Sequence, residues 1–252
     1  MNKLQLSLVA LSVLLIASVG ANILLYKKLK NTFISLYQTS LNPLGIDQYD
    51  NRDITKTELP SVVFFGDSRA NQWKEPDEQN FHFINRGISG QTSAQILWRF
   101  QEHIVPLKPQ IIVLQLGVND LRMLPDNSQT REDLVKNCQQ NIAQIIEQAD
   151  RINAIVILTT IFPLGAGDVP WKYRPFWASI DELQQSINEV NQYLKSLGDR
   201  VIVFDAYSLL DNKDRQKIEY YKDLLHLNRR GYELLNQELE KILIEVQAKQ
   251  KV

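Results

Sequence analysis

Short apolar runs alternate with helical periodicity from Ser61 to the C-terminus. The runs fall at Val62–Phe65, Phe81–Ile84, Ile111–Leu116, Ala154–Ile161 and Val201–Phe204, and helical spacing of apolar residues follows at Ala94–His103, Glu132–Ala149, Ile180–Leu197 and Arg229–Val246. Continuous apolar runs are typical of strands covered on both faces. Their alternation with helices predicts an α/β domain with a five-stranded parallel sheet between two helical layers. In such a domain ligands bind at the carboxyl ends of the strands.

The N-terminus carries an apolar segment outside this alternation. Residues Leu4–Tyr26 contain no charged side chain, and Lys27, Lys28 and Lys30 follow directly. A membrane-spanning helix needs about 20 apolar residues, whereas the apolar part of a signal peptide has about 7–15. Val19-Gly20-Ala21 resembles a cleavage site, but the apolar run continues beyond it. We therefore expect residues 1–26 to be a transmembrane anchor rather than a cleaved signal segment.

The charges on either side of this segment indicate on which side of the membrane the following domain lies. The three lysines after the segment outnumber Lys3 before it, which by the positive-inside rule favours the cytoplasm. The short N-terminal tail and the signal-like start favour export, and we expect an extracytoplasmic domain.

Residues 27–60 have the pattern of a juxtamembrane stalk. Its first part shows some helical spacing, Asn42-Pro43 and Gly45 break that pattern, and Asp47–Thr57 is polar. We expect the folded domain to comprise residues 61–252.

The composition of the chain excludes several kinds of binding site. The chain is 44% hydrophobic and 23% charged with a formal net charge of -1, so no basic excess indicates nucleic acid binding. Cys138 is the single cysteine, which excludes an intramolecular disulfide and a thiolate zinc site, and we expect it to be buried. Nothing in the chain calls for a cofactor or a metal ion.

Two polar motifs follow the first two expected strands. Gly66-Asp67-Ser68 comes directly after the first strand, where a serine either caps a helix or presents its hydroxyl to a ligand. The elbow motif G-x-S-x-G is absent because Ala70 replaces its last glycine. Asn85–Ser93 follows the second strand, and its two glycines permit a tight turn with exposed N–H groups.

Two further motifs follow the third strand and precede the last helix. In Gly117-Val118-Asn119-Asp120, Asn119 either forms a turn or donates its amide to a developing oxyanion. In Asp223-Leu224-Leu225-His226, the spacing of three lets a carboxylate orient an imidazole. The other histidines, His82 and His103, have no acid at such a spacing, and we expect both to be structural.

The order of these four motifs resembles that of the SGNH, or GDSL-like, hydrolase family. Its marks are a serine in G-D-S, a glycine, an asparagine in G-x-N-D and a histidine in D-x-x-H. Asn85–Ser93 with Leu97-Trp98-Arg99 is similar to platelet-activating-factor acetylhydrolase-like and lysophospholipase-like members, and His226-Leu227-Asn228 with Gly231-Tyr232 is similar to the usual family ending. The resemblance covers about three-quarters of the chain, from Ser61 onward.

The resemblance implies a flavodoxin-like three-layer sandwich and a serine esterase mechanism. Ser68 would be the nucleophile, His226 its base, and Asp223 the residue that orients His226. The N–H groups of Ser68 and Gly90 and the amide of Asn119 would form the oxyanion hole. The sequence departs from the family at two positions. Arg69 replaces the usual leucine, and we expect it to alter the pocket mouth but not the nucleophile, while Leu224 replaces a small residue.

A long loop at the end of the fourth strand is the candidate for substrate binding. Residues Pro163–Ser179 exceed the usual length of such a connection and include the aromatic residues Trp171, Tyr173, Phe176 and Trp177. These rings either contact substrate or pack among themselves. A lipid ester, such as a lysophospholipid, and an O-acetylated glycan are equally compatible substrates.

Three other functions are alternatives to that of an esterase. An acyltransferase would use the same triad, and a non-catalytic membrane-anchored binding protein on this fold would lack a catalytic group. A flavin- or nucleotide-binding domain would need a phosphate-binding loop after the first strand, where Asp67 would repel phosphate.

Overall fold

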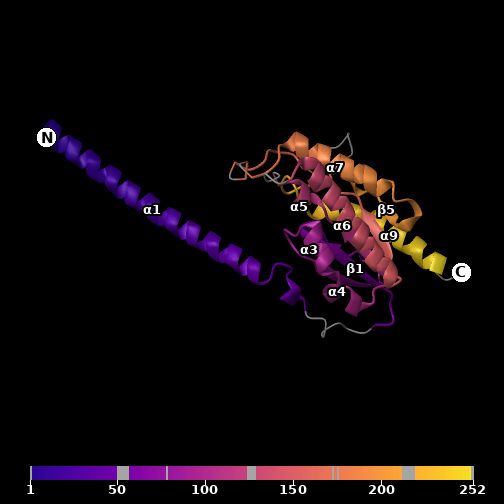
Figure 1. The fold of residues 1–252 in the computed structure, drawn as a ribbon. Coiled ribbons are helices and arrows are strands. Elements are labelled where there is room, and N and C mark those ends of the chain that lie inside the picture. The colour runs from indigo at the N-terminus through magenta and orange to yellow at the C-terminus, as the bar shows by residue number, and fades with distance from the viewer. Residues whose placement is uncertain are drawn as a thin grey trace. The chain divides into compact units, whose positions relative to one another are not determined.

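A computed structural model of the chain describes residues 2–49, 57–77, 79–123, 129–171, 173–174, 176–211 and 219–250. The chain forms two compact units, Met1–Pro43 and Leu44–Val252 (Figure 1). The second unit thus begins inside the segment expected to be a stalk. Most of the polar stretch 47–57 lies outside the described residues.

The first unit is one long helix, α1 (Lys3–Leu41), which continues without a break from the apolar segment through the lysines. Its portion Lys3–Ile34 is long and apolar enough to cross a membrane, a property that signal sequences near an N-terminus share. The helix ends just before Asn42-Pro43, because the residue before a proline disfavours the α conformation.

The second unit contains the expected five-stranded parallel sheet. Its strands are β1 (Ser61–Gly66), β2 (His82–Gly87), β3 (Ile111–Gln115), β4 (Ile155–Thr159) and β5 (Ile202–Phe204), in the order β2-β1-β3-β4-β5. This is the flavodoxin-like order. Gly66 of β1 is in register with both Gly87 and Gln115, so the carboxyl ends of the three strands lie side by side.

Alternate residues of β1 enter two separate cores, which makes the unit a three-layer sandwich. Val63 and Phe65 pack with residues of α3 (Ser93–Trp98), α4 (Phe100–His103), α6 (Arg131–Arg151) and α7 (Ile180–Lys195). Val62 and Phe64 pack with residues of α8 (Ala206–Leu210) and α9 (Arg229–Gln250). Cys138 is fully buried in the first core, as expected.

Short helices at the strand ends depart from the expected pattern. α2 (Ser68–Asn71) follows β1, and α5 (Val118–Leu121) follows β3. The predicted helix Ala94–His103 is divided into α3 and α4 at Arg99, whose φ of -88° and ψ of 1° interrupt the helix. Helices of a single turn have no apolar periodicity, so the sequence pattern does not reveal them.

Candidate active site

Ser68 lies in a tight turn between β1 and α2. Gly66 has a φ of +155°, and a Cβ there would lie 1.7 Å from the carbonyl oxygen of Gln115, so only glycine fits. Asp67 caps α2, its Oδ1 accepting the Arg69 N–H at 2.8 Å. Ser68 is therefore the first residue of α2, at the carboxyl edge of the sheet where ligands bind in this class of fold.

Arg69 does not lie at a pocket mouth, so that expectation is wrong. Its side chain is fully buried, with Nε donating to the Leu225 carbonyl at 2.8 Å and the guanidinium 5.2 Å from the centroid of the Phe162 ring. A buried guanidinium needs hydrogen-bond acceptors, and the carbonyls of Leu225 and Phe162 each accept one hydrogen bond from it. Arg69 thus joins the turn of Ser68 to the loop that carries His226.

That loop is held as a closed turn ahead of α9. The Lys222 N–H donates to the His226 carbonyl at 3.0 Å, and the Asn228 N–H donates to the Tyr220 carbonyl at 2.8 Å. Within the turn, the Asp223 Oδ1 accepts the N–H groups of Leu225 and His226, each at 2.9 Å. Leu224, where the family has a small residue, is buried in the first core.

Ser68, His226 and Asp223 form a continuous hydrogen-bonded chain. The Ser68 Oγ lies 3.0 Å from the His226 Nε2, and the His226 Nδ1 lies 2.9 Å from the Asp223 Oδ2. A carboxylate only accepts, so Nδ1 carries the hydrogen and Nε2 is left to accept the serine hydroxyl. Burial raises the pKa of Asp223, but its hydrogen bonds to Leu225 and His226 outweigh burial and bring that pKa below its usual value.

Gly90 and Asn119 are brought together by Gln91. The Asn119 Nδ2 donates to the Gln91 carbonyl at 2.9 Å, so the buried amide of α5 contacts the residue next to Gly90. An amide nitrogen has two hydrogens, and this bond uses one of them. Gly90 has a φ of +82°, is exposed, and has no atom within 4 Å of the position of a Cβ, so its backbone borders open space.

Two buried carboxylates stabilise the same rim without belonging to the hydrogen-bonded chain of Ser68, His226 and Asp223. Asp120 accepts the Ser93 N–H at 2.9 Å and the Ser93 hydroxyl at 2.5 Å, which joins α5 to the start of α3. Burial raises the pKa of Asp120 to about 6, and burial raises that of Asp67 to about 6 as well. No such role was predicted for Asp120 from the sequence, although G-x-N-D contains it.

The loop Pro163–Ser179, called the aromatic loop below, contacts the candidate site on two sides. At its start, the Gly165 N–H donates to the Leu224 carbonyl at 2.8 Å; at its end, the Ala178 N–H donates to the Arg122 carbonyl at 2.9 Å, just after α5. Trp177 stacks on Tyr173 with 5.1 Å between ring centroids and lies 4.8 Å from the Arg122 guanidinium. Trp171 and Phe176 are 81% and 60% exposed. Trp177 and Tyr173 therefore pack on each other, whereas Trp171 and Phe176 are open to solvent.

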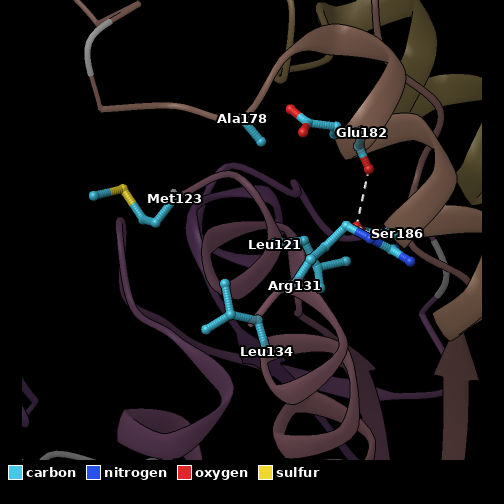
Figure 2. A pocket seen from close by; sticks show the side chains of 7 residues that line it. All are labelled: Leu121, Met123, Arg131, Leu134, Ala178, Glu182 and Ser186. Carbon is cyan, nitrogen blue, oxygen red and sulfur yellow. Dashed lines mark hydrogen bonds between the residues drawn. The ribbon is translucent and has the colours of Figure 1, made fainter. Parts of the chain in front are cut away.

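A small cavity of about 70 Å³ lies beyond α5, next to the end of this loop (Figure 2). Leu121, Met123, Leu134 and Ala178 form its apolar wall, and Arg131, Glu182 and Ser186 form its polar side. None of the residues predicted for catalysis lines it. In the described part of the chain, no three His, Cys, Asp or Glu side chains are grouped to hold a metal ion.

Comparison with known families identifies the family of the chain. Residues 62–234 match the model of the GDSL-like Lipase/Acylhydrolase family. The chain belongs to this family. The match includes all four motif positions and, apart from Ser61, all five strands, so this GDSL-like protein is an esterase or acylhydrolase by family.

Individual relatives support the assignment. The GDSL-like protein is 26% identical to subunit alpha1 of platelet-activating factor acetylhydrolase IB from Rattus norvegicus, over 77% of this chain and 79% of the relative. It is 27% identical to an uncharacterized lipoprotein of Bacillus subtilis over 42% of this chain, and that match spans half of the lipoprotein. A GDSL-like lipase from Bacteroides thetaiotaomicron, 24% identical, shares the fold with a TM-score of 0.65 over 81% of this chain and 98% of the lipase.

Proposed function

We propose that this GDSL-like protein is a serine hydrolase that cleaves carboxylic esters through an acyl-enzyme. The observation that carries the proposal is the hydrogen-bonded chain from the Ser68 Oγ through His226 to Asp223. His226 takes the hydroxyl proton while the Ser68 Oγ bonds to the ester carbonyl carbon, and the same imidazole then gives that proton to the departing alcohol. Water, deprotonated by His226, next attacks the acyl-enzyme and releases the acid and free Ser68.

The oxyanion hole would be formed at the rim beside Gly90. Gly90 and Ser68 offer backbone N–H groups, and Asn119 offers the amide hydrogen that Gln91 does not use. Donors fixed in this way stabilise the negative oxygen that develops in the transition state without having to reorient.

Asn119→Ala is expected to lower kcat by about 10²–10³, because one fixed donor to the oxyanion is lost. KM should change little, since the developing charge is absent from the bound ester. Steady-state kinetics on a p-nitrophenyl ester measures both. As a control, Asn188→Ala removes an exposed amide on α7, and its kcat should equal that of the wild type. Equal kcat in Asn119→Ala and the wild type would rule out the amide as a donor.

The aromatic loop is the proposed determinant of substrate choice, with a lipid ester or an O-acetylated glycan as the substrate. It joins the loop of Asp223 and His226 to the end of the helix that carries Asn119. Exposed rings in this position offer stiff, apolar contact area for an acyl chain or a sugar face. A panel of acetyl to long-chain esters, lysophospholipids and acetylated glycans identifies the class, and an added acceptor alcohol separates hydrolysis from acyl transfer.

Trp171→Ala and Trp177→Ala are expected to have different effects. Trp171 is exposed, so its loss should change the ratio of kcat/KM between short and long acyl esters while thermal stability is kept. Trp177 packs on Tyr173 and Arg122, so its loss should lower the melting temperature and leave the chain-length preference closer to that of the wild type. An unchanged preference in Trp171→Ala would remove this ring from the substrate site.

We also propose that α1 anchors the protein in a membrane, with the catalytic unit on the extracytoplasmic side. The apolar side chains of α1 that the structure describes are exposed, and a relative in Bacillus subtilis is an uncharacterized lipoprotein. The full chain should therefore stay in the membrane fraction through a sodium carbonate wash, and protease added to intact spheroplasts should degrade the catalytic unit. Recovery of a soluble chain that begins near Asn22 would show cleavage of a signal segment instead.

A further inference from the structure

The segment Leu44–Tyr49 follows the end of α1 along the chain. It packs against residues 87–92, which lie between β2 and α3 and are called the Gly90 loop below. The Gln91 Nε2 donates to the Leu44 carbonyl at 2.8 Å. A Cβ on Gly45 would lie 3.1 Å from the Ile88 Cδ1, and the Tyr49 hydroxyl donates to the Gly87 carbonyl. The segment thus contacts the Gly90 loop on both sides of Gly90.

A second connection runs through the buried side chain of Arg99, at the junction of α3 and α4. Its Nε donates to the Gln91 Oε1 at 2.5 Å, its Nη1 to the Arg86 carbonyl at 2.8 Å, and its Nη2 to the Gly66 carbonyl at 2.8 Å. One guanidinium therefore joins the end of β1, just before Ser68, to the two ends of the Gly90 loop.

His103 links Arg99 to the segment. Arg99 has no acceptor, so its Nη1 donates to the His103 Nδ1 at 3.1 Å, and the His103 Nε2–H must then donate to the Ile46 carbonyl at 3.1 Å. Burial lowers the pKa of His103, which keeps the ring in the neutral form that this arrangement requires. The Tyr49 ring packs on the same group, 4.7 Å from the Arg86 guanidinium and edge-on to His103.

The network ends at the oxyanion hole. Gln91 bonds to Leu44 and Arg99 through its side-chain amide and to the Asn119 amide through its carbonyl. Displacement of Gln91 would therefore move the N–H of the adjacent Gly90 and the Asn119 amide together.

We propose that Leu44–Tyr49 is a positioning element of the active site, which holds the Gly90 loop in the geometry that binds the oxyanion. Arg99 and His103 act with it as positioning residues that do not touch the substrate. The proposal rests on the proposed function, because it assigns the segment a part in the same oxyanion hole. The functional unit then begins at Leu44, directly after the Asn42-Pro43 break, rather than at Ser61.

The test uses Gly45→Ala and Tyr49→Ala in the full chain, with Gly198→Ala as the matched control. Gly45 and Gly198 have nearly equal φ values, +62° and +60°, so alanine strains the backbone alike at both. Only at Gly45 would the new methyl group meet the Gly90 loop, since nothing lies within 4 Å at Gly198. Tyr49→Ala tests the segment without backbone strain.

Two measurements are made on each variant: hydrogen–deuterium exchange of the peptide that covers residues 87–92, and kcat and KM on a p-nitrophenyl ester. In both test variants, exchange in this peptide should rise about tenfold. The kcat should fall about tenfold at nearly constant KM, a smaller loss than the about 10²–10³ for a deleted donor. Inhibition by a trifluoromethyl ketone, which mimics the tetrahedral intermediate, should weaken in parallel with kcat. Gly198→Ala should match the wild type in each measurement.

Exchange equal to that of the wild type, or an equal change in Gly198→Ala, would overturn the proposal. Faster exchange with an unchanged kcat would also overturn it, because the segment would then stabilise the loop without positioning the oxyanion hole. A wild-type chain that hydrolyses no ester would instead overturn the proposed function, and the positioning role with it.

Discussion

Replacement of Ser68 by alanine is expected to abolish ester hydrolysis almost completely, with a loss in kcat on the order of 10⁶, as for triad serines elsewhere. The Ser68 Oγ is the atom that the His226 Nε2 faces at 3.0 Å, and without it no acyl-enzyme forms. The comparison is made at equal concentrations of folded protein, with circular dichroism as the check on folding.

The matched control for this variant is Ser196→Ala. Ser196 is an exposed serine whose hydroxyl donates to the Tyr193 carbonyl at the end of α7. It should keep the kcat of the wild type. If Ser68→Ala also kept that kcat, the nucleophile would have to be another group and the proposed mechanism would be wrong.

Asp223→Asn is expected to lower kcat by about 10⁴, the scale seen when a triad aspartate becomes an amide. The Asp223 Oδ1 accepts two backbone N–H groups, so an asparagine oxygen would stay there and place its NH₂ group toward the His226 Nδ1. Nδ1 would then have to accept, the ring hydrogen would move to Nε2, and the imidazole could no longer take the Ser68 proton.

Asp205→Asn is the control, since Asp205 also caps a turn, by accepting the Ser208 N–H, but lies at the start of α8. Asp205→Asn should have the kcat of the wild type.

The pH profile gives a further check. Because the pKa of Asp223 lies below its usual value, its carboxylate stays ionised as the pH falls toward 5. The acid limb of kcat/KM above pH 5 should therefore contain no protonation of Asp223, whereas Asp67 and Asp120, whose pKa burial raises to about 6, can each add a protonation there. An NMR titration in which the Asp223 carboxylate takes up a proton above pH 5 would contradict the assignment.

The fold was predictable from sequence because burial on both faces leaves continuous apolar runs such as Ile111–Leu116. The candidate site was predictable because each motif lies at the carboxyl end of a strand or precedes a helix, and parallel strands end at one edge. Gly66 shows why the motif before Ser68 has a glycine, since the backbone of Gln115 leaves no room for a Cβ at that position.

What the sequence did not reveal depends on partners that are distant along the chain. An arginine is almost never fully buried, so its residue type gave no indication that Arg69 lies inside the fold. Its burial depends on the carbonyl of Leu225 and the ring of Phe162, which folding brings beside it. The docking of Leu44–Tyr49 was missed for the same reason, because it uses backbone carbonyls that leave no trace in the pattern of apolar residues.

The central claim is that Ser68 is the nucleophile, and covalent labelling with a fluorophosphonate tests it most directly. The full chain is treated with the reagent, digested and examined by mass spectrometry. The account predicts one phosphonylated site, Ser68, with labelling strongly slowed in Asp223→Asn and absent in Ser68→Ala. A wild-type chain that is not labelled, or a label on another residue that persists in Ser68→Ala, would contradict it.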